Sequence, residues 1–134
     1  MNDHGVVWFR KDLRLIDNPA WDAAVGACRR VTALFVVDPA VMDLAGPHRR
    51  TQLAAHLRAL DEDLQALGGR LRLRSGDPAT VVPQVMEEAG AEMVDDVWQF
   101  AGKPVRIKFI IRVEDERRVL GDLVREALQG AGFA

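Results

Sequence analysis

The stretch at residues 5–21, GVVWFRKDLRLIDNPAW, decides how this chain of 134 residues folds. It opens with an apolar run at residues 6–9, which is typical of a buried strand. Three cations and one acid follow within five residues. The stretch then closes on Asp17-Asn18-Pro19, where an Asp or Asn side chain can cap a helix and proline fits its first position. The pattern predicts a strand, a charged loop and a helix, and such loops bind ligands in open α/β sheets.

The length and composition of the chain predict one globular domain, residues 1–134. A single cysteine, Cys28, excludes an internal disulfide and is expected to pack as a small core residue on a helix. The N-terminus lacks a signal-peptide pattern, and the longest apolar run is far too short to cross a membrane, so we expect a cytoplasmic protein without membrane contact. A net charge of -2 argues against strong direct DNA binding.

The next part of the chain continues the alternation of strands and helices. We expect a helix from Asn18 to about Arg29 and a second strand at residues 31–37, apolar on both faces and therefore covered on both. A long helix at residues 49–67 has a leucine stripe, and a strand at residues 70–74 alternates arginine and leucine. A further helix is expected at residues 79–89.

The last forty residues follow a different pattern. A strand at residues 91–100 is separated by only four residues from a second one, Val105–Val113, which has one apolar face. Because a parallel crossover needs a dozen or more residues, adjacent strands here should pair antiparallel. A helix at residues 114–129 ends the chain. The expected fold is a Rossmann-like or flavodoxin-like α/β/α domain with a mostly parallel sheet, strand order 3-2-1-4-5, the first strand central and the last one antiparallel.

Several short motifs resemble the amino-terminal domain of the DNA photolyase and cryptochrome family. Residues 8–15 read WFRKDLRL and residues 17–20 read DNPA. The family usually has a second arginine where this chain has Lys11. Further matches follow in order: FVVDP at 35–39, RR at 49–50, GGRL at 68–71 and GDP at 76–78. The resemblance covers about residues 5–95, and residues 96–134 depart from the family pattern.

Polar side chains gather where the predicted parallel strands end. Cations, an acid and an aromatic ring at one edge suit a flat polar heterocycle with an anionic tail. The resemblance implies that this edge holds a light-harvesting antenna chromophore, an 8-hydroxy-deazaflavin or methenyltetrahydrofolate. The candidate chromophore-binding residues are Arg10, Lys11, Asp12, Phe35, Asp38, Arg49 and Arg50. Asp12 and Arg14 have a structural alternative, in which they brace the loop.

The resemblance implies an antenna role and no repair catalysis by this chain alone. The family is that of the deoxyribodipyrimidine photolyases, which are lyases of DNA repair, but their FAD-binding catalytic domain has no match here, so FAD is not expected on this chain. We expect a fragment or a stand-alone relative that works with an FAD-containing domain in cis or in trans. No catalytic residues are assigned, because the sequence has no P-loop, nucleophile elbow or metal-ligand spacing.

Two other hypotheses remain open. The chain could be a non-catalytic interaction module that has lost the pocket and forms a homodimer through the Val105–Val113 edge strand. It could also be a small nucleotide-binding domain, which only the fold suggests.

Overall fold

The computed structural model describes residues 2–94, 97–100, 102–104 and 125–133. The chain divides into two units, Met1–Gln84 and Val85–Ala134. The first unit contains a parallel sheet and the second a small antiparallel sheet. The expectation that the whole chain forms a single domain stays a prediction.

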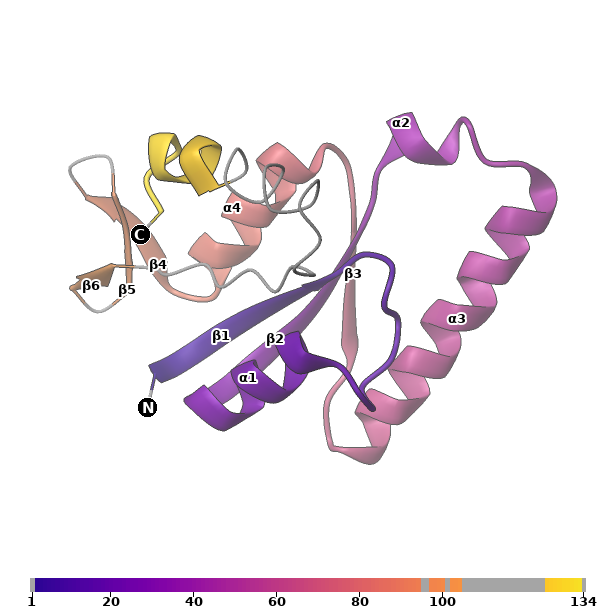
Figure 1. The fold of residues 1–134 in the computed structure, drawn as a ribbon, viewed down its shortest axis with the longest axis horizontal. Coiled ribbons are helices and arrows are strands. Elements are labelled where there is room, and N and C mark those ends of the chain that lie inside the picture. The colour runs from indigo at the N-terminus through magenta and orange to yellow at the C-terminus, as the bar shows by residue number, and fades with distance from the viewer. Residues whose placement is uncertain (1, 95–96, 101, 105–124, 134) are drawn as a thin grey trace, which may run out of the picture. The chain divides into compact units, whose positions relative to one another are not determined.

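The sheet of the first unit consists of β1 (Asn2–Phe9), β2 (Cys28–Val37) and β3 (Leu71–Ser75). All three strands run parallel in the order β1-β2-β3, with β2 in the middle (Figure 1). Phe35 is the register partner of Phe9 on one side and of Leu73 on the other. This arrangement confirms the α/β class, the parallel pairing and the 3-2-1 part of the predicted order.

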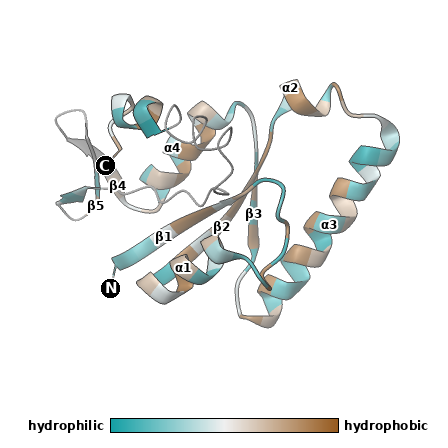
Figure 2. Cartoon of the chain, viewed as in Figure 1, coloured by the Kyte–Doolittle hydropathy of each residue, from teal (hydrophilic) through white to brown (hydrophobic). Residues whose placement is uncertain are grey.

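Helices α1 (Pro19–Ala27) and α3 (Pro47–Ala66) pack their apolar side chains against one face of this sheet. Figure 2 shows that β1 is hydrophilic at its start and hydrophobic along its second half, whereas α3 alternates both kinds of residue. The rings of Phe9 and Trp21 lie 6.1 Å apart in this core. The buried cluster comprises Val7, Phe9, Ala33, Phe35, Leu60 and Leu64. Leu34 and Val36, which alternate with these residues along β2, are also buried, as expected of a strand covered on both faces.

Four described helices begin with proline: α1, α2 (Pro39–Met42), α3 and α4 (Pro78–Glu88). Proline suits this position because its missing N–H would have no partner within the helix. At three of these starts the preceding side chain accepts hydrogen bonds from the first turn. Asn18 accepts from the N–H groups of Ala20 and Trp21, both at 3.2 Å. Asp38 and Asp77 each accept from the amide two residues later, at 3.0 Å. The predicted cap at Asn18 is confirmed.

The boundary between α1 and β2 lies earlier than the sequence pattern suggested. The helix ends at Ala27 and Cys28 already has extended backbone, with φ -127° and ψ 144°. The expected position of Cys28 on a helix is therefore wrong. The reason is the ladder with β1, which begins at the pairing of Asn2 with Cys28 and extends the strand backwards through two exposed arginines. The Cys28 sulfur lies over Gly5, where an added Cβ would approach it to 2.8 Å.

The second unit replaces the predicted strand at residues 91–100 with a hairpin. Its strands β4 (Ala91–Val94) and β5 (Val97–Phe100) pair antiparallel, and β5 pairs antiparallel with β6 (Lys103–Pro104). The single strand predicted for residues 91–100 is wrong, because only two residues connect β4 and β5, the length of a tight hairpin connection. Gly102, with φ 75°, lies between β5 and β6.

The second half of the predicted strand order, with the first strand central, stays a prediction. Among the described strands β4 pairs with β5, and β2 lies between β1 and β3 in the parallel sheet. The predicted strand at residues 105–113 and the helix at 114–124 lie outside the described residues, whereas residues 125–130 are helical. None of the helices that the structure describes is long and apolar enough to cross a membrane.

Candidate functional site

The carboxyl ends of the three parallel strands define one edge of the sheet. β1 ends at Phe9, β2 at Val37 and β3 at Ser75, and the backbone N–H of Gly76 donates to the Val37 carbonyl at 3.0 Å. Because the strands are parallel and in register, the residues that follow them emerge at the same edge. Lys11 and Asp38 each follow a strand end and therefore belong to this edge.

The cations after β1 remain exposed, and one of them already has an aromatic partner. The Arg10 guanidinium carbon lies 5.0 Å from the centre of the Trp8 ring, within the range of a cation–π contact. Trp8 is 38% exposed, so the pair is open to solvent. Lys11 and Asp12 are exposed as well. The loop thus presents charge at the edge, but no described contact joins the three side chains.

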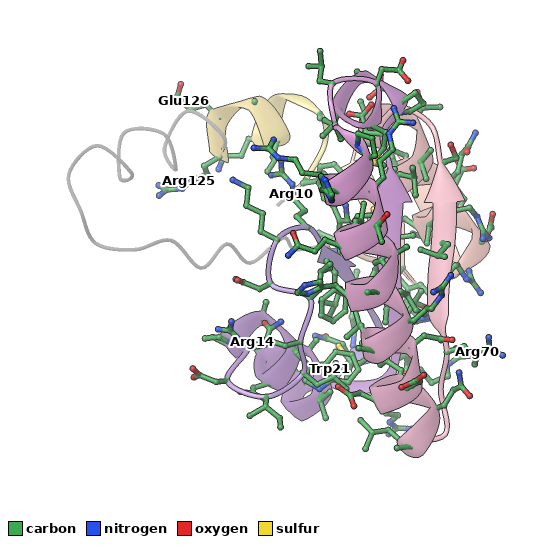
Figure 3. All side chains as sticks on the ribbon, turned by 90° about the vertical axis from the view of Figure 1, so that its right-hand side faces the viewer. Arg10, Arg14, Trp21, Arg70, Arg125 and Glu126 are labelled. Atoms are coloured by element: carbon green, nitrogen blue, oxygen red, sulfur yellow. The ribbon has the colours of Figure 1, made fainter. Side chains whose placement is uncertain are left out.

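The rest of this loop is held by hydrogen bonds between its own residues. The Arg14 guanidinium donates to the carbonyls of Ile16, at 3.2 Å, and Asp17, at 3.3 Å. The Asn18 amide donates back to the Arg14 carbonyl at 2.9 Å. These bonds hold Asp17 in the left-handed region, at φ 54°. Figure 3 shows Arg14 at the level of Trp21 and well below Arg10. The structural alternative for Arg14 agrees with this geometry.

Two further candidates, Phe35 and Asp38, already have structural roles in core packing and helix capping. Phe35 is only 7% exposed and packs in the core cluster, so it presents almost no ring face to a ligand at the edge. The Asp38 carboxylate caps α2 through Ala40. The backbone carbonyl of Asp38 also accepts from the N–H groups of Val41 and Met42. Asp38 therefore fixes the start of α2 directly after β2.

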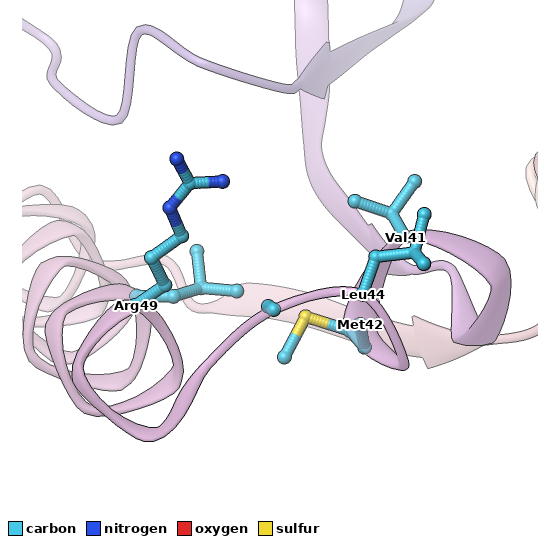
Figure 4. Close-up of a pocket in the computed structure, with 6 residues that line it drawn as sticks. Val41, Met42, Leu44 and Arg49 are labelled. Carbon is cyan, nitrogen blue, oxygen red and sulfur yellow. The ribbon is translucent and has the colours of Figure 1, made fainter.

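A hollow of about 370 Å³ lies between α2 and the first turns of α3. Figure 4 shows the Arg49 guanidinium on one side of it, with Val41 and Leu44 opposite. Arg49 and Leu53 are four residues apart and therefore share one face of α3. The lining residues are Val41, Met42, Leu44, Ala45, Arg49 and Leu53. The hollow thus combines one cation with an apolar wall.

Arg50 has a different position from its neighbour Arg49. Its Nε donates to the Ala45 carbonyl at 3.1 Å and its Nη2 to the Met42 carbonyl at 2.8 Å. Its guanidinium is therefore bound to the backbone that forms one wall of the hollow. Of the seven candidates, only Arg49 lines this hollow.

The sequence pattern predicts a loop or a short turn of helix at residues 40–47 and no site residue there, so the apolar wall was missed. The signal that could have found it is the cap at Asp38-Pro39 followed by Val41, Met42 and Leu44. Val41 is 63% exposed and Leu44 is 87% exposed, and both line the same hollow. Among the described residues no group of three or more His, Cys, Asp or Glu side chains could hold a metal ion.

The parallel sheet, its carboxyl edge and the hollow beside α2 define an α/β domain with a candidate ligand site. The family model "DNA photolyase" matches residues 5–116, well over half of the chain. The chain belongs to the DNA photolyase family. This match extends beyond residue 95, where the resemblance was expected to end.

Individual relatives agree with this assignment. The chain is 39% identical to a cryptochrome DASH of Natronomonas pharaonis, over 98% of this chain and 27% of the relative. It is 46% identical to a deoxyribodipyrimidine photo-lyase of Streptomyces griseus, over 66% of this chain and 20% of the relative. A solved bacterial class III photolyase from Agrobacterium tumefaciens superposes with a TM-score of 0.66 at 28% identity, covering 100% of this chain and 25% of that one. The chain thus spans about a quarter of the length of such relatives.

Proposed function

We propose that this chain binds a light-harvesting antenna chromophore at the carboxyl edge of its parallel sheet. The observation that carries the proposal is the hollow between α2 and α3, where the Arg49 guanidinium faces an apolar wall. Its volume of about 370 Å³ falls within the range of small-molecule sites. The family membership and the position of α2 directly after the end of β2 give further support.

The chemistry of the hollow suits a flat ring system with a localised negative charge. The apolar side chains would cover the ring faces and exclude water from them. Arg49 would pair with the anionic group, and Lys11, Arg10 and Asp38 would meet the part of the ligand that extends along the edge. Both 8-hydroxy-deazaflavin and methenyltetrahydrofolate combine these features.

The test is a titration of the purified chain with each chromophore, followed by absorbance and fluorescence. We expect saturable binding of one of them and a red shift of its near-ultraviolet or blue band on transfer into the apolar hollow. Arg49→Met should weaken this binding at least tenfold and reduce its salt dependence, because it removes the cation and keeps the apolar stem. Arg58→Met, on an exposed position of the same helix, is the matched control.

Two results would contradict the proposal. One is a wild-type chain that saturates with neither chromophore. The other is a chain that binds a nucleotide such as ADP more tightly than either chromophore, which would favour the nucleotide-binding alternative. A colourless protein that is dimeric by light scattering and binds no chromophore would favour the interaction module, whose proposed strand at residues 105–113 lies outside the described residues.

The wider role follows from the coverage of the relatives. Because the matched relatives are about four times as long, we propose that this chain supplies its chromophore's excitation to an FAD-containing catalytic domain, in cis or in trans. Deoxyribodipyrimidine repair would belong to that larger assembly. Co-purification with such a domain, and energy transfer from the bound antenna to its flavin, would test this part.

A further inference from the structure

The wall of the hollow comes from a segment with little support of its own. Four of its six lining residues lie between positions 41 and 45. Helix α2, which contributes the first two of them, has only four residues, far fewer than a helix needs to be stable by itself. Val41 and Leu44 are mostly exposed, so burial does not hold them in place. The Asp38 cap and backbone hydrogen bonds hold the turns of residues 38–45, but none of these bonds links the segment to α3.

Arg50 provides that link. Its two donors reach the Met42 carbonyl at 2.8 Å and the Ala45 carbonyl at 3.1 Å, and both acceptors belong to residues that line the hollow. The Met42 carbonyl ends α2 and also accepts from the Ala45 N–H at 3.1 Å, whereas the Ala45 carbonyl lies three residues beyond the helix. The backbone N–H of Arg50 also bonds the Gly46 carbonyl at 3.2 Å, which fixes the arginine at the start of α3.

We infer that Arg50 is a positioning residue for the chromophore site. This inference rests on the function proposed above. Its planar guanidinium holds the 42–45 backbone at a fixed distance from α3 and so sets the width of the hollow. Arg49, one residue earlier, supplies the charge for the ligand. Arg49 and Arg50 are adjacent in the sequence motif, but they thus have different roles.

The first measurement needs no ligand. The methionine methyl groups are labelled with ¹³C, and the signal of Met42 is assigned by Met42→Leu. We expect Arg50→Met to shift this signal in the folded protein, because the wall moves, whereas Arg58→Met leaves it in place. Melting curves are recorded for both variants, so that the spectra are compared well below unfolding.

The second measurement separates positioning from charge. Arg50→Met should weaken chromophore binding about tenfold, a loss of about 1.4 kcal/mol, and leave the salt dependence of the affinity as in the wild type. Arg50→Lys should fail to restore the affinity, since an ammonium group keeps the charge but not the planar pair of donors.

Two results would overturn the inference. The first is an Arg50→Met variant with an unshifted Met42 signal and wild-type affinity. The second is a weakened variant with a smaller salt dependence that Arg50→Lys rescues, which would make Arg50 a charge contact. If the wild type binds neither chromophore, the proposed function fails, and the Met42 signal alone decides whether Arg50 shapes the hollow.

Discussion

Asp61 on α3 accepts a hydrogen bond from the backbone N–H of Leu71, the first residue of β3, at 2.8 Å. The same carboxylate accepts from Arg70 at 3.2 Å and from Gln65 at 2.9 Å. One side chain thus joins the end of the long helix to the start of the next strand. The Leu71 bond, followed by the Arg70 bond, lowers the pKa of Asp61 from its ordinary value of 3.8.

The lowered pKa of Asp61 predicts how stability depends on pH. The pKa of Asp61 is lower in the folded chain than in the unfolded chain. Its carboxylate therefore contributes fully to stability above the unfolded pKa, and this contribution is lost as the pH falls through the folded pKa. Asp61→Asn should therefore lower the melting temperature at neutral pH and flatten its decline in acid. Asp63→Asn, exposed on the same helix, is the control. If the melting temperatures of the wild type and Asp61→Asn fall equally as the pH is lowered, the prediction is contradicted.

The cap of α1 can be tested by changing one end of the Asn18 amide at a time. Asn18→Ala removes two accepted bonds and the donated bond to Arg14, and we expect a loss of about 1–2 kcal/mol in unfolding free energy. Asn18→Asp keeps the acceptor and loses the donor, so it should cost less than alanine. Urea denaturation measures both. An alanine variant as stable as the wild type would show that the cap contributes nothing.

The contact between Gly5 and Cys28 predicts a compensating pair of substitutions. A Cβ at position 5 would lie 2.8 Å from the Cys28 sulfur, so Gly5→Ala should destabilise the chain by about 1–3 kcal/mol. The double variant Gly5→Ala with Cys28→Ala should recover much of this loss, because the obstructing sulfur is gone. A thermodynamic cycle of the four proteins provides the measurement. Additive losses would mean that the two positions do not interact.

The leucine stripe of α3 divides into core and surface positions. Leu60 is 1% exposed and packs in the core cluster, so Leu60→Ala should cost about 2–5 kcal/mol. Leu67 was expected on the same stripe, yet it is 68% exposed just beyond the end of the helix. Leu67→Ala should therefore change the unfolding free energy little. Equal losses in chemical denaturation would contradict this division.

The sequence predicted those features of the fold that depend on short-range patterns. The apolar run ending at Phe9, the cap at Asn18 and the doubly covered second strand all follow from residue type and spacing. The antiparallel pairing of β4 with β5 escaped prediction, because residues 91–100 were interpreted as one strand although Asp95-Asp96 interrupts their apolar residues. The early start of β2 escaped as well, since exposed Arg29 and Arg30 enter the strand only through pairing with β1.

The candidate site could be predicted only in part, and for a physical reason. Sequence placed Arg49 and Arg50 near the carboxyl edge, but it could not say which guanidinium turns toward the hollow and which toward the Met42 carbonyl. It also selected Phe35 for its aromatic ring, although the register of β2 turns that ring into the core. Side-chain direction at an edge depends on register and helix rotation, which residue types alone do not specify.

The central place of β2 has a consequence for how the first unit comes apart. Its backbone is hydrogen-bonded to a neighbour along both sides, and four consecutive residues from Ala33 to Val36 are buried. Neither β1 nor β3 can release β2 by fraying alone, so its amide protons should exchange with deuterium only when the entire sheet opens. The slowest-exchanging amides of this unit would then report its global opening, with β2 as the last strand to lose protection.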